Sequence, residues 1–205
     1  SKEIIAPWRD NEGINISGKN VNYSELTALY WLWKNRLLPE ETYINGKNDN
    51  AEYYGLFHYR RVLDITEKDL LRIKSSDVDV ILPFPMLCEP DIKEHHTRYI
   101  SESDWQAMLQ ALEELQPDYA KAYDAVFSQR YFYNYNMIIA KKSVLNDYCG
   151  WLFPVLERTE ELSSPRGWQR ADRYIGYLGE NLMTLYFMYH REDFHIAHTG
   201  RIMLI

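Results

Sequence analysis

A cluster of cationic and aromatic side chains follows a short apolar segment in the first third of the chain. The stretch Tyr53–Leu63 reads YYGLFHYRRVL, so a predicted strand ends in His58, Tyr59, Arg60 and Arg61. Two guanidinium groups, an imidazole and a phenol supply hydrogen-bond donors and positive charge, which suit an anionic group such as a diphosphate. Surface arginines that pair with nearby acids would give the same pattern, so the cluster alone leaves both interpretations open.

Acidic residues at two other places could take part in chemistry. Asp77-Val-Asp79 has the Asp-x-Asp pattern by which many nucleotide-using enzymes hold a divalent cation against a diphosphate. The two acids also alternate with valines, as residues on the solvent-exposed face of a strand would. We favour this second interpretation. Glu180 follows Gly179 in a predicted helix, where the glycine either lets a substrate approach the carboxylate or only eases packing.

Two histidine-containing segments are less suited to a site. His95 and His96 lie near a cysteine and a glutamate, but adjacent histidines point to opposite sides of the backbone and no second ligand pair has usable spacing. We therefore expect solvated loop histidines rather than a zinc site. His198 and Arg201 could reach a phosphate, but a terminal strand with solvated ends is the simpler expectation.

Composition limits the class of protein. With 205 residues the chain is long enough to bury a core, and we expect one domain over residues 1–205. The formal net charge of −7, without a basic stripe, argues against a nucleic-acid binder. Two distant cysteines and the lack of a long apolar run predict a cytoplasmic protein, with contact at the inner face of the cell membrane left open.

The elements that must position these groups alternate between helices and strands. Asn22 with Glu25 predicts a capped helix that Pro39 ends, and Thr66 with Asp69 predicts a second capped helix. Strand, helix and strand in succession predict an α/β fold. Strands are expected over 53–57, 78–82, 130–141 and 194–205, irregular structure over 84–100, and further helices over 101–116, 119–127, 143–162 and 172–189.

Several motifs, in chain order and over nearly the whole sequence, resemble one family. They are DNEGINISGKN at 10–20, ELTALYWLWKN at 25–35, GLFHYRR at 55–61, NMIIAKK at 136–142 and YCGWLF at 148–153. Together they resemble the bacterial domain of unknown function 4422, which is found in capsular, exopolysaccharide and O-antigen clusters. The resemblance implies a single GT-A-like α/β domain, with a central mixed sheet flanked by helices.

The resemblance also implies an activity. Members of the family are taken to be Leloir glycosyltransferases, so we expect an enzyme that moves galactofuranose or galactose from a UDP-sugar to a growing surface polysaccharide or lipid-linked oligosaccharide. Family members begin with a strand that helps to hold the nucleotide, and this sequence starts after that point. An N-terminal strand is therefore expected to be missing, and the alternative is a non-catalytic carbohydrate-binding or assembly subunit.

Site residues follow from the same resemblance. In a GT-A-like fold a strand near the middle of the sheet ends in Asp-x-Asp, whereas the comparable strand here, at 53–57, ends in the cationic cluster. The cluster is thus expected to replace the metal, with Mn2+ or Mg2+ at Asp77 and Asp79 left open. The expected donor-binding residues are Asn15, Ser17, Lys19, Asn20, His58, Tyr59, Arg60 and Arg61.

Catalysis and acceptor binding complete the expected site. An inverting transfer needs a carboxylate to take the acceptor hydroxyl proton. Glu180 is the first candidate for this base and Asp172 the second, with His58 as a further catalytic residue. Asn134 and Asn136 are expected to bind the acceptor.

Overall fold

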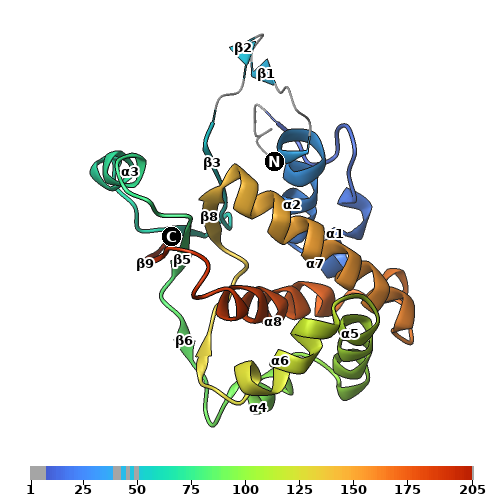
Figure 1. Ribbon diagram of the computed structural model, residues 1–205. Helices are drawn as coiled ribbons and strands as arrows, with labels where there is room; N and C mark the ends of the chain where they lie inside the picture. The colour runs from blue at the N-terminus through green and yellow to red at the C-terminus, as the bar shows by residue number, and fades with distance from the viewer. Residues whose placement is uncertain (1–7, 39–42, 45–46, 49–50, 205) are drawn as a thin grey trace.

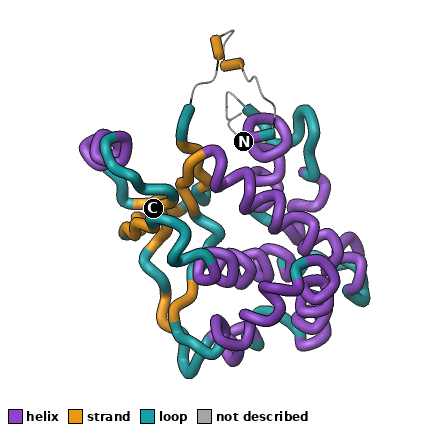
Figure 2. Tube along the Cα trace, viewed as in Figure 1, coloured by secondary structure: helices purple, strands orange, loops and turns teal. Residues whose placement is uncertain are grey.

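The computed structural model describes residues 8–38, 43–44, 47–48 and 51–204. The chain forms a mixed α/β structure in which a small central sheet is flanked by helices, as expected (Figure 1). Figure 2 shows the strands gathered on one side of the molecule and most helices packed on the other, while α3 (Glu67–Lys74) stands apart beyond the strands.

The central sheet has the strand order β3-β8-β5-β9. β8 (Ile138–Lys141) runs antiparallel to both β3 (Tyr53–Leu56) and β5 (Val80–Pro83), and β5 runs parallel to β9 (Ile196–Thr199). The expectation that the strand at 53–57 lies near the middle of the sheet is wrong for the described residues. β3 pairs there with β8 alone and forms an edge of the sheet.

Two predicted strands are each divided in the structure. The strand expected over 130–141 becomes β7 and β8, because Tyr135 and Asn136 have φ angles of 71° and 50° and take the backbone out of the extended conformation. The terminal strand expected over 194–205 becomes β9 and β10, on either side of Gly200. The short antiparallel pairs are β1 (Tyr43–Ile44) with β2 (Lys47–Asn48), β4 (Arg61–Leu63) with β10 (Arg201–Met203), and β6 (Met86–Leu87) with β7 (Tyr131–Phe132).

Within the described ranges, more residues lie in helices than in strands. None of the helices within the described ranges is long and apolar enough to cross a membrane. A π-helical turn over Trp33–Leu37 follows α2, and 3-10 turns cover Ser17–Lys19 and Gly167–Gln169. Besides α3, the α-helices are α1 (Asn20–Tyr23), α2 (Leu26–Leu32), α4 (Ile92–His96), α5 (Glu102–Leu115), α6 (Pro117–Phe127), α7 (Lys142–Leu162) and α8 (Tyr174–Tyr189).

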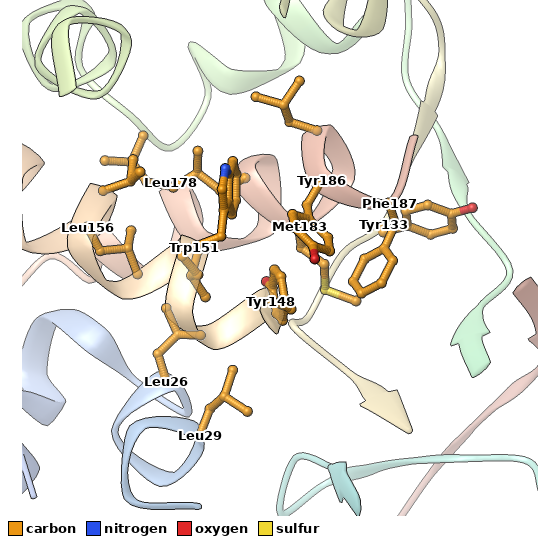
Figure 3. Packing of buried hydrophobic residues seen from close by; sticks show 14 of the residues in the cluster. Leu26, Leu29, Tyr133, Tyr148, Trp151, Leu156, Leu178, Met183, Tyr186 and Phe187 are labelled. Atoms are coloured by element: carbon orange, nitrogen blue, oxygen red, sulfur yellow. The ribbon is translucent and has the colours of Figure 1, made fainter. Parts of the chain in front are cut away.

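The core is built around α7 and α8. α8 is buried on nearly all its faces, and its Tyr186 ring lies 5.1 Å from the rings of both Tyr148 and Trp151 of α7. Figure 3 shows these side chains above Leu26 of α2. A helix buried this completely is expected to be apolar all round. A carboxylate in its middle, at Glu180, therefore requires an explanation.

One predicted helix start is confirmed and another is wrong. Thr66 and Asp69 form a capping box at α3, as the sequence predicted. The box expected from Asn22 and Glu25 does not form, because Ser24 has a φ of 49° and separates α1 from α2. Asn22 instead lies inside α1 and donates from Nδ2 to two backbone carbonyls of the segment before α8. The Glu25 carboxylate is left to make other bonds.

The histidines expected to be solvated are buried. Asp91 caps α4 by accepting from the Glu94 amide, and the resulting helix turns His95 and His96 inward. The His96 ring stacks on Trp105 with centroids 3.8 Å apart. Burial lowers the pKa of both imidazoles, so the neutral form is favoured and they pack as aromatic side chains.

Candidate functional site

The cationic cluster lies on a tight turn and not at the end of a long strand. The His58 amide donates to the Arg61 carbonyl at 3.0 Å, and the Arg61 amide donates to the His58 carbonyl at 3.3 Å. The chain therefore reverses directly after β3 and enters β4 at Arg61. Tyr59, at the tip of the turn, is 83% exposed.

This turn forms one wall of a cavity of about 390 Å³, which we call the first cavity. Four separate parts of the chain meet there: the junction of α1 and α2, the turn, Tyr135, and the first turns of α8. The lining residues are Asn20, Ser24, Glu25, Phe57, His58, Tyr59, Arg61, Tyr135, Arg173, Gly176, Tyr177 and Glu180.

A hydrogen-bonded group around His58 organises the wall of the first cavity. The His58 Nε2 lies 2.5 Å from the Tyr135 carbonyl oxygen and 3.5 Å from Oε1 of Glu25. Asn136 donates from Nδ2 to the same Glu25 oxygen at 2.6 Å. Burial acts to lower the pKa of His58, but the bond and charge of Glu25 and the Tyr135 carbonyl outweigh it, so the net pKa is raised. The protonated, cationic imidazole is thereby favoured.

Glu180 lies at the boundary of the cavity with an unusual proton affinity. Burial and, second, the charge of Glu25 raise the pKa of Glu180 to about 8, while the Tyr135 amide and Arg61 act in the opposite direction. A carboxyl group with this pKa can hold a proton or release it near neutral pH, as a general base requires.

Gly179 serves packing and not substrate approach. A Cβ at this position would meet the Leu26 Cδ1 atom at 2.6 Å and the Asn136 Oδ1 atom at 3.3 Å. The absent side chain lets α8 lie close to α2 and to the Tyr135–Asn136 turn. Gly179 thus brings Glu180 and Glu25 into the same cavity.

Positive charge gathers at the side of the first cavity formed by the turn. The Arg61 guanidinium lies over the Tyr135 ring, 4.4 Å from its centroid, and the Arg201 guanidinium lies 5.1 Å from the same centroid. Arg173 lines the cavity from the N-cap position of α8. Arg61 and Arg173 line the cavity and, with His58, provide cations for an anionic ligand, whereas Arg201 lies outside the lining.

Backbone strain is concentrated around the same cavity. Within the described part of the chain, the non-glycine residues with positive φ are Ser24, Tyr135, Asn136 and Arg173. Ser24, Tyr135 and Arg173 line the first cavity, and Asn136 bonds to its Glu25. Such conformations cost on the order of 1–3 kcal/mol each and cluster at functional sites. The backbone conformation therefore indicates this cavity as a candidate functional site, independently of the charges that line it.

A second cavity of about 350 Å³ adjoins the first at Glu180. It shares Tyr135, Tyr177 and Glu180 with the first cavity. Its other lining residues come from β6, α4 and the segment that follows it, β7, Asn134 and α8: Met86, His95, His96, Arg98, Tyr99, Ile100, Phe132, Asn134 and Asn181.

The structure brings part of the expected donor-binding set together. Asn20, His58, Tyr59 and Arg61 all line the first cavity, whereas Arg60 does not and lies over the Tyr59 ring at 5.1 Å. Asn15 accepts from the Ser17 hydroxyl at 2.9 Å in a local turn, and the Lys19 ammonium lies 2.5 Å from Oε2 of Glu160. Asn15, Ser17 and Lys19 therefore satisfy one another or the α7 carboxylate outside the cavity lining.

The other expected site residues are distributed as follows. Glu180 lines both cavities, but Asp172 lines neither and accepts from Arg170 Nη2 at 2.5 Å. Asn134 lines the second cavity and accepts a hydrogen bond from Arg201. Asn136 is 1% exposed and lies behind the wall of the first cavity, where it bonds to Glu25.

Asp77 and Asp79 are held by a lysine and a histidine. Lys141 donates from Nζ to Asp79 at 2.9 Å and to Asp77 at 3.2 Å, and the His195 amide donates to Asp79 at 2.9 Å. Although partial burial opposes it, these bonds lower the pKa of Asp79. Within the described ranges, no three His, Cys, Asp or Glu side chains are grouped as metal ligands would be. The donor set at Asp77 and Asp79 thus does not fit a divalent cation.

Sequence reasoning missed several residues of the first cavity. Glu25 was assigned to a helix cap, and Tyr135, Arg173 and Tyr177 were not considered. Glu25 and Tyr135 border two of the motifs that carried the family resemblance, so the motif boundaries were an available signal. Nothing in the local pattern around Arg173 indicates a site.

Comparison with known proteins agrees with this architecture. Residues 1–192 match the family described as a domain of unknown function (DUF4422). The apo structure of WbbM, a bifunctional glycosyltransferase, superposes with a TM-score of 0.73 and 26% sequence identity over 95% of this chain. The chain spans 39% of that longer protein. No curated protein sequence matches it.

Proposed function

The chain belongs to the DUF4422 family, and we propose that it is a glycosyltransferase that moves a hexose from a nucleoside diphosphate sugar to a saccharide hydroxyl. The observation that carries the proposal is the first cavity, in which a carboxyl group with a pKa of about 8 faces a guanidinium group and an imidazole. The similarity to WbbM supports the same class of reaction.

The cationic wall suits the leaving group. Transfer separates the anomeric carbon from a diphosphate, whose negative charge grows in the transition state and must meet fixed positive charge. Arg61, Arg173 and protonated His58 line the cavity where that charge would develop. We propose that they bind the diphosphate, so that transfer proceeds without a divalent cation.

Glu180 completes the reaction as the general base. The oxygen of the acceptor hydroxyl attacks the anomeric carbon as the bond from that carbon to the diphosphate oxygen breaks. The bonding electron pair leaves with the diphosphate, and the hydroxyl proton passes to the Glu180 carboxylate. Displacement from one side and departure from the other inverts the configuration at the anomeric carbon. Asp172, which bonds to Arg170, lies outside the lining of either cavity and is not needed for this step.

The donor, the acceptor and the use of a divalent cation can each be tested by assay. UDP-galactose and UDP-galactofuranose are the donors to test, with a lipid-linked or synthetic oligosaccharide acceptor of a bacterial surface polysaccharide. Calorimetric titration with UDP, in Mn2+ and in chelator, measures nucleotide binding and cation use in one experiment. We expect UDP to bind equally in both conditions and the donor to release UDP when acceptor is added.

Two variants separate catalysis from simple carbohydrate binding. Glu180→Gln should lower kcat by about a hundredfold or more while UDP binding is retained, because removal of a general base typically costs that factor. His58→Ala should weaken UDP binding as well as turnover. A wild-type protein that binds glycans without releasing UDP from either donor, and whose glycan binding survives both substitutions, would replace the proposal with the non-catalytic function.

A further inference from the structure

The second cavity lies outside the set of residues proposed to bind the diphosphate, yet it shares the proposed base Glu180 with the first cavity. None of the residues of the cationic turn lines it, and the two cavities share Tyr135, Tyr177 and Glu180. Apart from these shared residues, the first cavity is lined by the α1–α2 junction, the turn after β3 and the start of α8, and the second by β6, α4, β7 and the segment after α4. A ligand in the second cavity could therefore contact Glu180 without displacing one in the first.

The polar groups of the second cavity are incompletely bonded. Asn181 is 3% exposed and donates from Nδ2 to the Tyr177 carbonyl at 2.8 Å, but its Oδ1 atom accepts no hydrogen bond from the described residues. A buried amide oxygen without a donor is costly and is normally matched by protein, water or ligand. Because Asn181 lines the cavity, a ligand hydroxyl placed there would supply the missing donor.

Aromatic rings form the apolar part of the same cavity. Tyr99 and Tyr177 pack with centroids 5.2 Å apart, and both line the cavity beside Phe132. Tyr99 also lies 5.8 Å from the ring of His95, and it remains 55% exposed, so part of its surface is open to a ligand. Flat apolar faces next to a hydroxyl acceptor fit a pyranose or furanose ring, which has C–H faces and a rim of hydroxyl groups.

We infer that the second cavity binds the terminal hexose of the acceptor, which packs on Tyr99 and Tyr177, donates a hydroxyl to Asn181, and turns its reacting hydroxyl toward Glu180. This inference rests on the proposed function, because it assigns the partner of the transfer. Tyr99 and Asn181 are then positioning and specificity residues for the acceptor sugar, and Glu180 joins the acceptor cavity to the donor cavity.

The test uses methyl glycosides of galactose, glucose and mannose as acceptor probes. Saturation-transfer NMR on the protein with excess UDP bound should detect the binding of at least one of these glycosides. Titration of that glycoside then gives its Kd. Tyr99→Ala should raise that Kd by about tenfold, as loss of one good contact does, and leave the Kd of UDP within about twofold. Asn181→Ala should raise the same Kd. Because Tyr99 is exposed, Tyr99→Ala is expected to fold even where the substitution at the buried Asn181 does not.

Tyr131→Ala is the matched control, since Tyr131 is an equally exposed tyrosine, at 54%, that lines neither cavity. It should leave both dissociation constants unchanged. Saturation transfer to none of the glycosides, or a glycoside Kd that Tyr99→Ala leaves unaltered, overturns the inference even when UDP binds. Absence of UDP binding and of UDP release overturns the proposed function instead, so the two failures are distinguishable.

Discussion

Removing the charge of Glu180 should stabilise the protein while it slows the proposed transfer. Glu180 lies in the middle of a buried helix, and its pKa rises from 4.5 to about 8 on folding, chiefly because burial disfavours the carboxylate. Glutamine has nearly the same shape, and its side-chain oxygen can still accept from the Tyr135 amide. Glu180→Gln therefore removes the ionisation and little else.

The sign and size of the effect follow from proton linkage. Below pH 4.5 the folded and unfolded chains both hold the proton, whereas between pH 4.5 and 8 the unfolded chain releases a proton that the folded chain keeps. The wild type accordingly loses stability as pH rises through that window, by at most about 5 kcal/mol. Because Glu180 retains contact with solvent through the cavities, we expect a difference of about 2 kcal/mol or more between the two proteins at pH 8.5.

Urea denaturation of wild type and Glu180→Gln at pH 5, 7 and 8.5 measures the difference in free energy of unfolding. The variant should be close to wild type at pH 5 and progressively more stable above it. Glu113→Gln, an exposed carboxylate of α5, is the control and should change stability by less than about 0.5 kcal/mol at every pH. A stability difference for Glu180→Gln that stays constant from pH 5 to 8.5 would refute the reasoning.

Other predictions concern the rate, the cationic wall and the packing of α8. The value of kcat/KM for transfer should rise with pH through about 8, because Glu180 loses its proton there and becomes a base. The residual kcat/KM of Glu180→Gln should lack this rise. Arg61→Ala should lower kcat/KM by about a hundredfold because Arg61 lines the first cavity, whereas Arg60→Ala, on the outside of the same turn, should lower it less than about threefold; equal losses would contradict the assignment of the wall. Gly179→Ala should reduce the free energy of unfolding by about 1–3 kcal/mol, because its Cβ would meet Leu26, while Gly18→Ala, with open space around it, should be neutral in the same urea titration.

The sequence predicted the fold well where local signals agree with tertiary packing. The capping box at Thr66, the helices on either side of Pro117 and the long helix after residue 142 are present close to their expected bounds. Predictions were wrong where one residue changes the backbone conformation. Ser24 moves the start of the helix that was predicted to be capped at Asn22, and Tyr135 divides the strand predicted over 130–141.

Only some residues of the candidate site could be predicted from local sequence patterns. His58 and Arg61 were found because their side chains cluster in sequence, and Glu180 because a glycine precedes it. The contacts of Glu25 that organise the site could not be predicted from local sequence. Glu25 lies 33 positions from His58 and 111 positions from Asn136, and it contacts both. Conversely, the 15–19 segment carries suitable polar side chains, but their local bonds to one another and to Glu160 engage them elsewhere.

Strained backbone positions orient the groups that surround the first cavity. Ser24, Tyr135 and Arg173 adopt a conformation that L-amino acids avoid, at a combined expense that is a sizeable fraction of a typical domain's stability. Each one turns the chain so that a neighbour faces the first cavity: Ser24 releases Glu25, Tyr135 presents its carbonyl to His58, and Arg173 begins the helix that carries Glu180. A fold selected for stability alone would place glycine or asparagine at such positions. Their convergence on one cavity, which also holds a destabilising carboxylate, agrees with the proposed role of this cavity in binding and chemistry.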